Sequence, residues 1–122
     1  MAYEIKYDES RNLALVRHFG TVDRNDLWNG REEAMKLVQG REHPSILVDM
    51  RSIELGISTM EEFNFARAQS NYSPGLAKVA VLIGKNDPRE KEHHLMETIG
   101  QNRGAMLRVF DDQAEAEKWL ME

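Results

Sequence analysis

The chain has 122 residues, no cysteine and a formal net charge of -5. That length predicts one domain, residues 1–122, that can bury a core without disulfides or metal ions. The lack of cysteine excludes thiol catalysis and zinc–thiolate sites, and the acidic balance disfavours nucleic acid and anionic membranes as partners. The longest apolar run, residues 79–83, is too short to span a bilayer, and the first residues do not form a signal peptide. We therefore expect a cytoplasmic protein with no integral membrane association.

A β-hairpin is predicted at the start of the chain. Polar and apolar residues alternate over Tyr3–Tyr7, and residues 8–12 are typical of a turn. Leu13–Phe19 is a second, more buried strand, which we expect to end at Gly20.

A helix is predicted after this hairpin. Asp23 is its expected N-cap, with Asp26 at position N3 completing a short capping box, and Gly40 marks its end. Gly30 inside the helix costs about 1 kcal/mol relative to alanine, so we expect close packing against the sheet to require it. The apolar residues of this helix are Leu27, Trp28, Ala34, Met35 and Val38.

The central strand and the start of the second helix follow one another closely. Ser45–Met50 is the predicted strand, with Asp49 after its apolar centre, and a loop is expected over residues 50–56. The helix begins at Ser58 or Thr59, where two overlapping Ser/Thr-x-x-Glu capping boxes occur. A hydroxyl thereby lies at a helix N-terminus near the end of a buried strand, where open α/β folds usually meet ligands and partners.

The second half of the chain continues this alternation. Residues 77–83 are almost continuously apolar, as in a strand covered on both faces. Residues 87–90, Asp-Pro-Arg-Glu, predict a helix start with the aspartate as N-cap. Residues 106–110 form the last predicted strand, and Asp112 begins the last helix. The residues that these two helices are expected to bury are Leu95, Met96, Ile99, Ala116, Trp119 and Leu120.

The predicted order is strand, strand, helix, strand, helix, strand, helix, strand, helix. Alternation after an initial hairpin predicts an α/β domain with right-handed crossovers and a mostly parallel sheet, with about five strands and four helices.

Four segments of the chain resemble a known family. They are Phe19–Asp23, Ile46–Met50, Leu76–Val81, and Leu107–Asp112 followed by Ala114, Ala116, Trp119 and Leu120. These segments are similar to the SpoIIAA-like family, within the STAS group of anti-anti-sigma-factor-like domains. The resemblance covers nearly the whole chain, and it implies a single-domain SpoIIAA/STAS-like β-α superhelix with an N-terminal β-hairpin. It also implies a non-enzymatic regulatory or interaction module.

The resemblance points to a switch position. The STAS group carries a serine at the start of its second helix that a partner kinase phosphorylates, and the strand-to-helix spacing places Ser58 there. The group's usual Asp-Ser followed by small residues and glycine is replaced by Ile57-Ser58-Thr59-Met60. A phosphate there would meet free N–H groups and the helix dipole. Ser58 and Thr59 are therefore candidate phosphorylation or switch positions, and helix capping alone is the alternative.

Two further groups of residues are candidate binding surfaces. Asp49, Arg51, Lys85 and Asn86 are expected near the C-terminal edge of the sheet, where a polar ligand could lie. The alternative for Asp49 is that it only holds its own loop through backbone amides.

The second group is apolar. Phe63 and Phe65 are two residues apart, so both cannot face the core of one helix. One of them is expected near the surface, or in a groove beside Trp28 or Met60. Such a groove marks a hydrophobic-ligand pocket or a dimer interface, and ordinary partial burial is the alternative.

No catalytic residue, metal site or cofactor is predicted. Glu90, His93, His94 and Glu97 have the spacing of half a di-iron site, but such sites need more carboxylates from other helices of a bundle. The chain has no nucleophile elbow, phosphate-binding loop or dinucleotide fingerprint, and no nucleophile is tied by spacing to its remaining histidines, His18 and His43.

The sequence leaves alternative functions open. The first is an interaction module that binds a protein partner, or a second copy as a homodimer, near the start of the second helix. Glu54, Glu61 and Glu62 would favour a basic partner surface there. The second is a carrier or sensor of a small apolar or amphipathic ligand, in a pocket between the sheet and the second helix. A third, an enzyme that uses His93 or His94 with Glu97, needs ligands that one helix rarely supplies.

Overall fold

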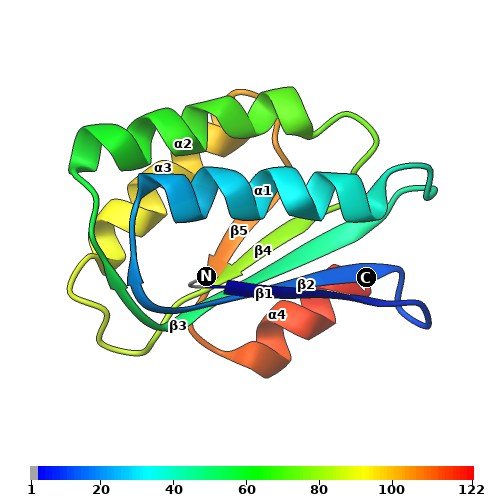
Figure 1. Cartoon of the computed structure of the whole chain (residues 1–122), viewed down its shortest axis with the longest axis horizontal. Helices are drawn as coiled ribbons and strands as arrows, with labels where there is room; N and C mark the ends of the chain where they lie inside the picture. The colour runs from blue at the N-terminus through cyan, green and yellow to red at the C-terminus, as the bar shows by residue number, and fades with distance from the viewer. Residues whose placement is uncertain (1–2) are drawn as a thin grey trace.

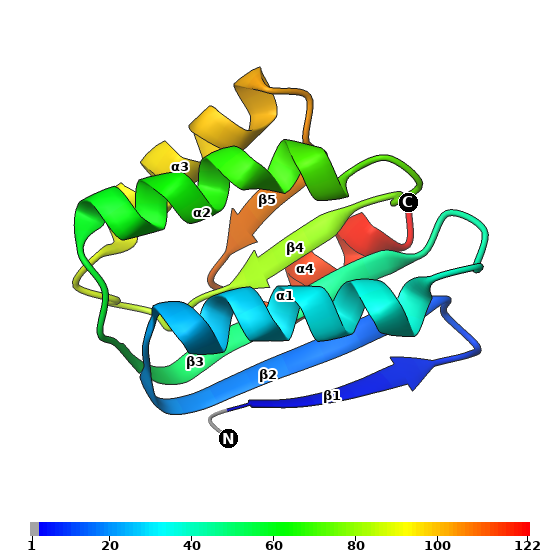
Figure 2. The ribbon, with the colours of Figure 1, turned by 45° about the horizontal axis from the view of Figure 1, so that its top comes forward.

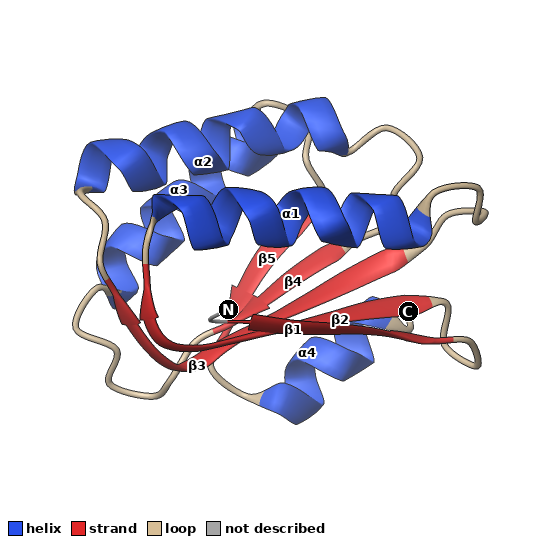
Figure 3. Ribbon diagram, viewed as in Figure 1, coloured by secondary structure: helices blue, strands red, loops and turns tan. Residues whose placement is uncertain are grey.

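The computed structural model describes residues 3–122. The strands are β1 (Tyr3–Asp8), β2 (Leu13–Val22), β3 (Ser45–Leu55), β4 (Val79–Leu82) and β5 (Leu107–Phe110). The helices are α1 (Arg24–Val38), α2 (Thr59–Tyr72), α3 (Glu90–Asn102) and α4 (Gln113–Leu120). The strands form one five-stranded sheet in chain order. The helices α1, α2 and α3 cover one face of this sheet and α4 covers the other, so the fold has three layers (Figures 1 and 3).

The sheet is mixed but mostly parallel. β1 pairs with β2 in the antiparallel direction, as the predicted hairpin requires. The other neighbouring pairs, from β2–β3 to β4–β5, are all parallel. The predicted α/β class and the predicted element order are therefore confirmed.

The predicted boundaries around the central strand are wrong. β3 continues through residues 50–55, where the sequence predicts a loop, and β2 continues past Gly20. The two extensions pair with each other as far as Val22 opposite Leu55. β4 has already ended opposite Asp49, so this part is a two-stranded ribbon at the end of the sheet (Figure 2). Its polar residues are strand residues that face solvent, which is why their pattern predicts a loop.

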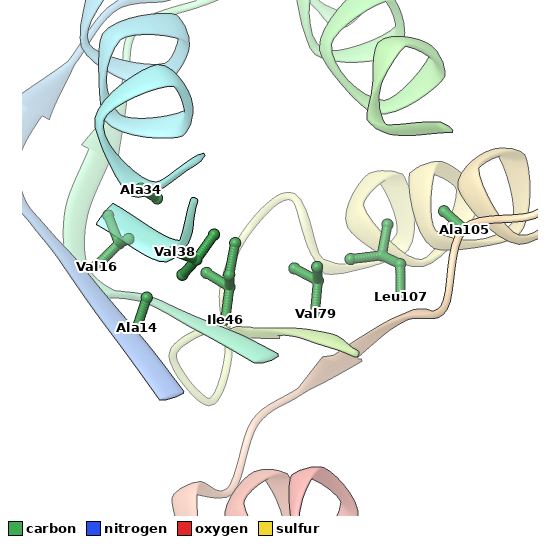
Figure 4. Close-up of a cluster of buried hydrophobic side chains, with 8 residues drawn as sticks. All are labelled: Ala14, Val16, Ala34, Val38, Ile46, Val79, Ala105 and Leu107. Atoms are coloured by element: carbon green, nitrogen blue, oxygen red, sulfur yellow. The ribbon is translucent and has the colours of Figure 1, made fainter. Parts of the chain in front are cut away.

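Alternate residues of the strands supply two separate cores, because successive side chains point to opposite faces of a sheet. The core on the side of α1 and α3 contains Ala14, Val16, Ala34, Val38, Ile46, Val79, Ala105 and Leu107 (Figure 4). The core under α4 contains Leu13, Leu47, Ala80, Leu82, Phe110, Ala116 and Leu120. The apolar strand β4 therefore has core residues on both faces, Val79 on one and Ala80 and Leu82 on the other, as predicted.

Capping explains where α1 and α4 begin. Asp23 and Asp26 form the predicted capping box of α1. Asp112 caps α4 by accepting the backbone N–H of Glu115 at 3.0 Å. Both assignments agree with the sequence patterns, because capping depends on residues three positions apart.

α3 differs from the prediction at its start and on its buried face. It begins at Glu90, and Asp87 accepts the backbone N–H of Arg89 at 2.8 Å in a turn before the helix. Leu95 is 56% exposed, although the sequence predicts it in the core. The face that packs inward follows the spacing i, i+3, i+7, and its residues are His93, Met96 and Gly100.

Gly30 brings α1 close to the sheet. A Cβ atom at this position would lie 3.1 Å from Cε1 of His18 on β2, closer than a side chain tolerates without a shift. The predicted reason for this glycine is therefore confirmed. The close approach places the ring of His18 directly under the helix.

Candidate functional site

A cavity of about 120 Å³ lies between the sheet and the helices α1, α2 and α3. Its floor includes Val16, Ile46, Val48, Val79, Val81 and Val109 from four strands. Its polar lining residues are His18, Arg31, Glu62, Gln69, His93 and Glu97. The cavity is thus mainly apolar, with a few polar groups, which is the usual character of a small-molecule site.

The floor of the cavity is not closed over by the helices. Val48, Val81 and Val109 lie on the strands β3, β4 and β5, yet each is only half-buried. Their neighbours Leu47, Ala80 and Phe110, on the α4 side, are buried. The two faces of the same sheet therefore differ: the α4 side is packed, and the opposite side keeps open space.

The inner face of α2 explains this space. α2 packs against α3 and, less extensively, against α1, and it makes few close contacts with any strand. Its buried residues are Glu62, Ala66 and Gln69. A helix that packs on a sheet normally presents large apolar side chains. One alanine between two polar residues does not fill the distance to the floor.

Arg31 is the most isolated charged group of the cavity wall. Its side chain belongs to α1, is 9% exposed, and donates a hydrogen bond from Nη2 to the backbone oxygen of Phe65 at 2.7 Å. The guanidinium lies over the ring of Phe65, 3.4 Å from its centroid, with the rings of Trp28 and Tyr72 at 5.4 and 4.9 Å. Burial lowers the pKa of Arg31 to about 10, so the group stays charged at neutral pH. Its Nη1 is buried and has no hydrogen-bond partner among residues 3–122.

His18 is a second buried polar group on the wall. It is 3% exposed, between Gly30 and the ring of Tyr3, whose centroid is 5.5 Å away. Burial lowers the pKa of His18, which keeps the ring neutral at neutral pH. Within the described part of the chain, its Nδ1 has no hydrogen-bond partner either.

A buried ionic network closes the α2–α3 side of the cavity. Nδ1 of His93 lies 2.6 Å from a carboxylate oxygen of Glu62, and Nε2 lies 3.4 Å from Asp87. Arg89 contacts the other oxygen of Glu62 at 3.1 Å and donates to the backbone oxygen of Ile57 at 2.9 Å. The network therefore joins α2, α3 and the segment that precedes α2.

The pKa values of His93 and Glu62 are both raised, for different reasons. Burial opposes a charge on His93, but its hydrogen bond with Glu62 and the charges of Glu62 and Asp87 outweigh burial and raise the pKa of His93. Burial raises the pKa of Glu62, and the neighbouring Glu92 adds to this effect, whereas His93 lowers it. The pair therefore holds its protons more tightly than free side chains do.

Comparison with known proteins bears on the fold. No protein-family model matches this sequence, and no curated protein matches it. A solved structure does match: an uncharacterised protein of the DUF3478 family with a SpoIIAA-like fold, from Shewanella loihica PV-4. The match has a TM-score of 0.64 and covers 98% of this chain and 92% of that chain, at 14% sequence identity.

The chain has a SpoIIAA-like fold. The resemblance found in the sequence is thereby confirmed for the fold. At this level of identity the match carries no ligand or partner over to this protein, and its counterpart is itself described as uncharacterised.

In this SpoIIAA-like fold, Ser58 and Thr59 lie exposed at the start of α2. Ser58 Oγ accepts the backbone N–H of Glu61 at 3.1 Å, and Glu61 accepts the N–H of Ser58 at 3.0 Å, which completes one capping box. The second predicted box is wrong, because Glu62 turns inward and the hydroxyl of Thr59 donates to Glu92 of α3. A switch role for either hydroxyl stays a prediction.

The predicted polar surface of the SpoIIAA-like fold lies outside the cavity. Asp49 forms an ion pair with Arg51 at 2.9 Å and accepts its backbone N–H at 3.0 Å, as the local alternative predicts. Burial alone would raise the pKa of Asp49, but the hydrogen bonds and the charge of Arg51 outweigh burial and lower this pKa. Lys85 and Asn86 are exposed in the loop after β4. A role for this surface stays a prediction.

The two phenylalanines of α2 lie in different places. Phe65 lines the cavity and packs edge-to-face on Trp28, with 5.6 Å between ring centroids. Phe63 is half-buried near Arg67, whose guanidinium is 5.8 Å from the ring. Met60, near the start of the helix, is 65% exposed. Of the predicted apolar residues, only Phe65 and its neighbour Trp28 are therefore associated with the cavity region.

The histidines of α3 do not act together. His93 faces inward, whereas His94 is exposed and lies 3.3 Å from Glu97. Across residues 3–122 no cluster of three or more metal-ligating side chains occurs. In the same range, no helix is both long and apolar enough to pass through a membrane.

Sequence reasoning missed most polar residues of the cavity. His18, Arg31 and Glu62 were not among its candidates for an interior site, and His93 was considered only as a metal ligand or a catalytic group. One signal was available: Arg31 lies between Leu27 and Ala34 on the apolar face of its helix. A charged residue at a core position is rare unless it is paired or functional.

Proposed function

We propose that this protein binds a small apolar or amphipathic molecule in the cavity beneath α2. The observation that carries the proposal is the cavity of about 120 Å³ over three half-buried valines of the sheet. Well-packed domains contain few voids larger than a water molecule. An apolar cavity of about 150 Å³ takes up benzene, so the expected ligand is of similar size.

Occupation of the cavity would be sensed by α2. A bound molecule would contact Phe65 and Ala66, and it would lie next to the pair formed by Glu62 and His93. α2 depends on α3 and α1 for its position, because it makes few contacts with the sheet. A ligand that bridges this gap would fix α2 more firmly. This would give a regulatory module a way to respond to a small molecule.

Trp28 provides a direct test of cavity binding, because its ring packs on Phe65 at the cavity wall. Replacing Trp119 on α4 by phenylalanine leaves Trp28 as the single tryptophan. Titration of this variant with benzene and with hexanol should change the emission of Trp28 and raise the melting temperature. Ligand that binds only the folded state stabilises it by mass action.

Two further variants make the test specific. Val81→Phe fills the cavity from the floor of β4 and should abolish both responses. Ile53→Phe, a similar enlargement on the β3 ribbon away from the cavity, should leave them intact. If the protein responds to neither probe, or if Val81→Phe responds as the parent does, the proposed function is wrong.

An exposed apolar side chain supports a second candidate function, the binding of a protein partner near the start of α2. Met60 is 65% exposed beside Ser58 and Thr59, and Glu54 adds acidic character. Phosphopeptide mass spectrometry on native protein, with partner capture by Ser58→Asp and by Ser58→Ala, tests this candidate. Absence of modification together with equal capture by both variants would count against a switch at Ser58.

A further inference from the structure

Among residues 3–122, no carboxylate forms an ion pair with the buried guanidinium of Arg31. Its described contacts are the backbone oxygen of Phe65, three aromatic rings and the hydroxyl group of Tyr72. Glu32 acts on its charge, but this carboxylate is exposed and accepts the hydroxyl hydrogen of Tyr72 at 2.6 Å. A buried charge is normally paired and hydrogen-bonded because its desolvation is costly. Arg31 is therefore held in a position where an incoming anion would find an unsatisfied cation.

The location of Arg31 relates this unsatisfied charge to the cavity. Arg31 lines the cavity, and its Nη1, which has no partner within the described residues, is buried. The guanidinium lies over the ring of Phe65 and Nη2 already donates to a backbone oxygen, so Nη1 is the donor that remains for a ligand. Planar, fork-like donors of this kind match the two oxygens of a carboxylate.

The opposite wall does not offer the same opportunity for an anion. Glu62 is already engaged by His93 and Arg89. Glu97 accepts the backbone N–H of Val109 at 2.5 Å. The charged groups of this wall are already paired with one another, and the unpartnered buried donor among the described residues is on Arg31, so the two walls together orient a ligand that carries one negative charge at one end.

We propose that the ligand is a small monocarboxylate, with its carboxylate on Arg31 and its apolar part over the valines of the sheet. This inference rests on the proposed function and adds the chemical class of the ligand. Nδ1 of His18, the other buried wall atom with no partner in the described chain, can provide a second polar contact. The apolar part is of the size of a benzene ring, as the volume of the cavity requires.

Four probes separate the contributions of head and tail. Benzoate carries both, benzamide has the same shape without the charge, benzene has the tail alone, and acetate has the head alone. Titration calorimetry at neutral pH should give the tightest binding for benzoate, by about tenfold to a hundredfold over benzamide. Benzene should bind weakly, and acetate should not bind measurably.

Variants of Arg31 and of a matched arginine identify the anchor. Arg31→Met keeps the apolar stem and should remove the preference for benzoate while benzene still binds, which also shows that the variant is folded. Arg31→Lys should restore part of the preference, because it keeps the charge and loses the fork. Arg24→Met is the control, since Arg24 is exposed on the same helix with its guanidinium 5.2 Å from the ring of Trp28.

The outcomes distinguish the two levels of the proposal. Equal binding of benzoate and benzamide, or a preference for benzoate that survives in Arg31→Met, would overturn the carboxylate assignment and leave the proposed function standing. Binding of acetate as tight as that of benzoate would indicate a simple anion site and would also overturn it. If none of the four probes binds, the carboxylate assignment and the proposed function both fail. The selectivity of the unmodified protein is decisive even if Arg31→Met does not fold.

Discussion

Individual polar residues set the character of the α1–α3 side of this domain. Arg31, Glu62 and His93 all occupy positions on the inner faces of their helices. Glu62 and His93 offset each other's burial through their ion pair, whereas Arg31 keeps an unpartnered Nη1 among the described residues. The presence or absence of a polar partner therefore separates the Glu62–His93 pair, which holds α2 and α3 together, from Arg31, which is available for a ligand.

The start of α2 gives a test at the residue scale. Ser58→Ala should lower the free energy of unfolding by about 1 kcal/mol, because the backbone N–H of Glu61 loses its acceptor. Thr59→Ala should cost less than about 0.5 kcal/mol, since its hydroxyl is exposed and caps no N–H group. Urea denaturation of the two variants measures both changes. Equal losses would contradict the assignment of Ser58 as the single N-cap.

At the scale of elements, α2 and α4 cover the sheet in different ways. α4 places Ala116 in a closed core, where it is fully buried. α2 places Ala66 on the cavity wall. The small side chain of Ala116 therefore lets α4 approach the sheet closely, whereas that of Ala66 leaves space between α2 and the sheet.

The same substitution on the two helices tests this difference. Ala116→Leu should lower the free energy of unfolding by about 1–3 kcal/mol, because extra carbon atoms overpack a closed core. Ala66→Leu should leave it within about 0.5 kcal/mol or raise it, because the new atoms enter the cavity and leucine is nearly as good a helix former as alanine. Urea denaturation compares the two directly. Similar losses in both variants would mean that the space under α2 is not available to a side chain.

At the scale of the whole molecule, the network around His93 connects α2, α3 and the end of β3 at one side of the cavity. Three charged groups act on His93: Glu62 on α2, and Asp87 and Arg89 before α3. The pKa of His93 is raised above its ordinary value of 6.5. The contribution of His93 to the free energy of unfolding is therefore complete below pH 6.5. It is lost as pH rises through the raised pKa of His93 in the folded protein. Glu62 likewise lowers the free energy of unfolding as pH rises above 4.5, because its pKa is also raised in the folded protein.

The free energy of unfolding should accordingly fall as pH rises above 6.5. Each unit of difference between the folded and unfolded pKa contributes about 1.4 kcal/mol. Urea denaturation at intervals from pH 6.5 to about 8.5 measures the slope, and His93→Gln should flatten it. Slopes that coincide in the parent protein and in His93→Gln would show that another group is responsible.

The edges of the sheet bear on the predicted homodimer. β5 is an edge strand whose backbone is partly covered by α3: Glu97 accepts the N–H of Val109 at 2.5 Å, and Gln101 donates to the oxygen of Leu107 at 2.8 Å. Side chains that satisfy an edge oppose strand pairing with another copy. Pairing through an edge would therefore use β1, and the homodimer itself stays a prediction.

The sequence by itself determined the elements and their order. Strand alternation at Tyr3–Tyr7, the Asp23 capping box and the apolar run at 77–83 are local patterns, and local spacing is enough to place helices and strands. It failed for residues 50–55, because the polarity of an exposed ribbon resembles that of a loop. It also failed for Leu95, because the buried face of α3 depends on where that helix starts.

Only the tertiary structure decided the cavity and the residues around it. Whether Arg31 lacks a partner, and whether Glu62 caps α2 or binds His93, depends on elements distant in the chain. A cavity is the space that remains when side chains from several helices and strands do not meet, and no single segment encodes that distance. The sequence therefore determined which surfaces face each other, and the packing of α2 on α3 decided that they enclose a site.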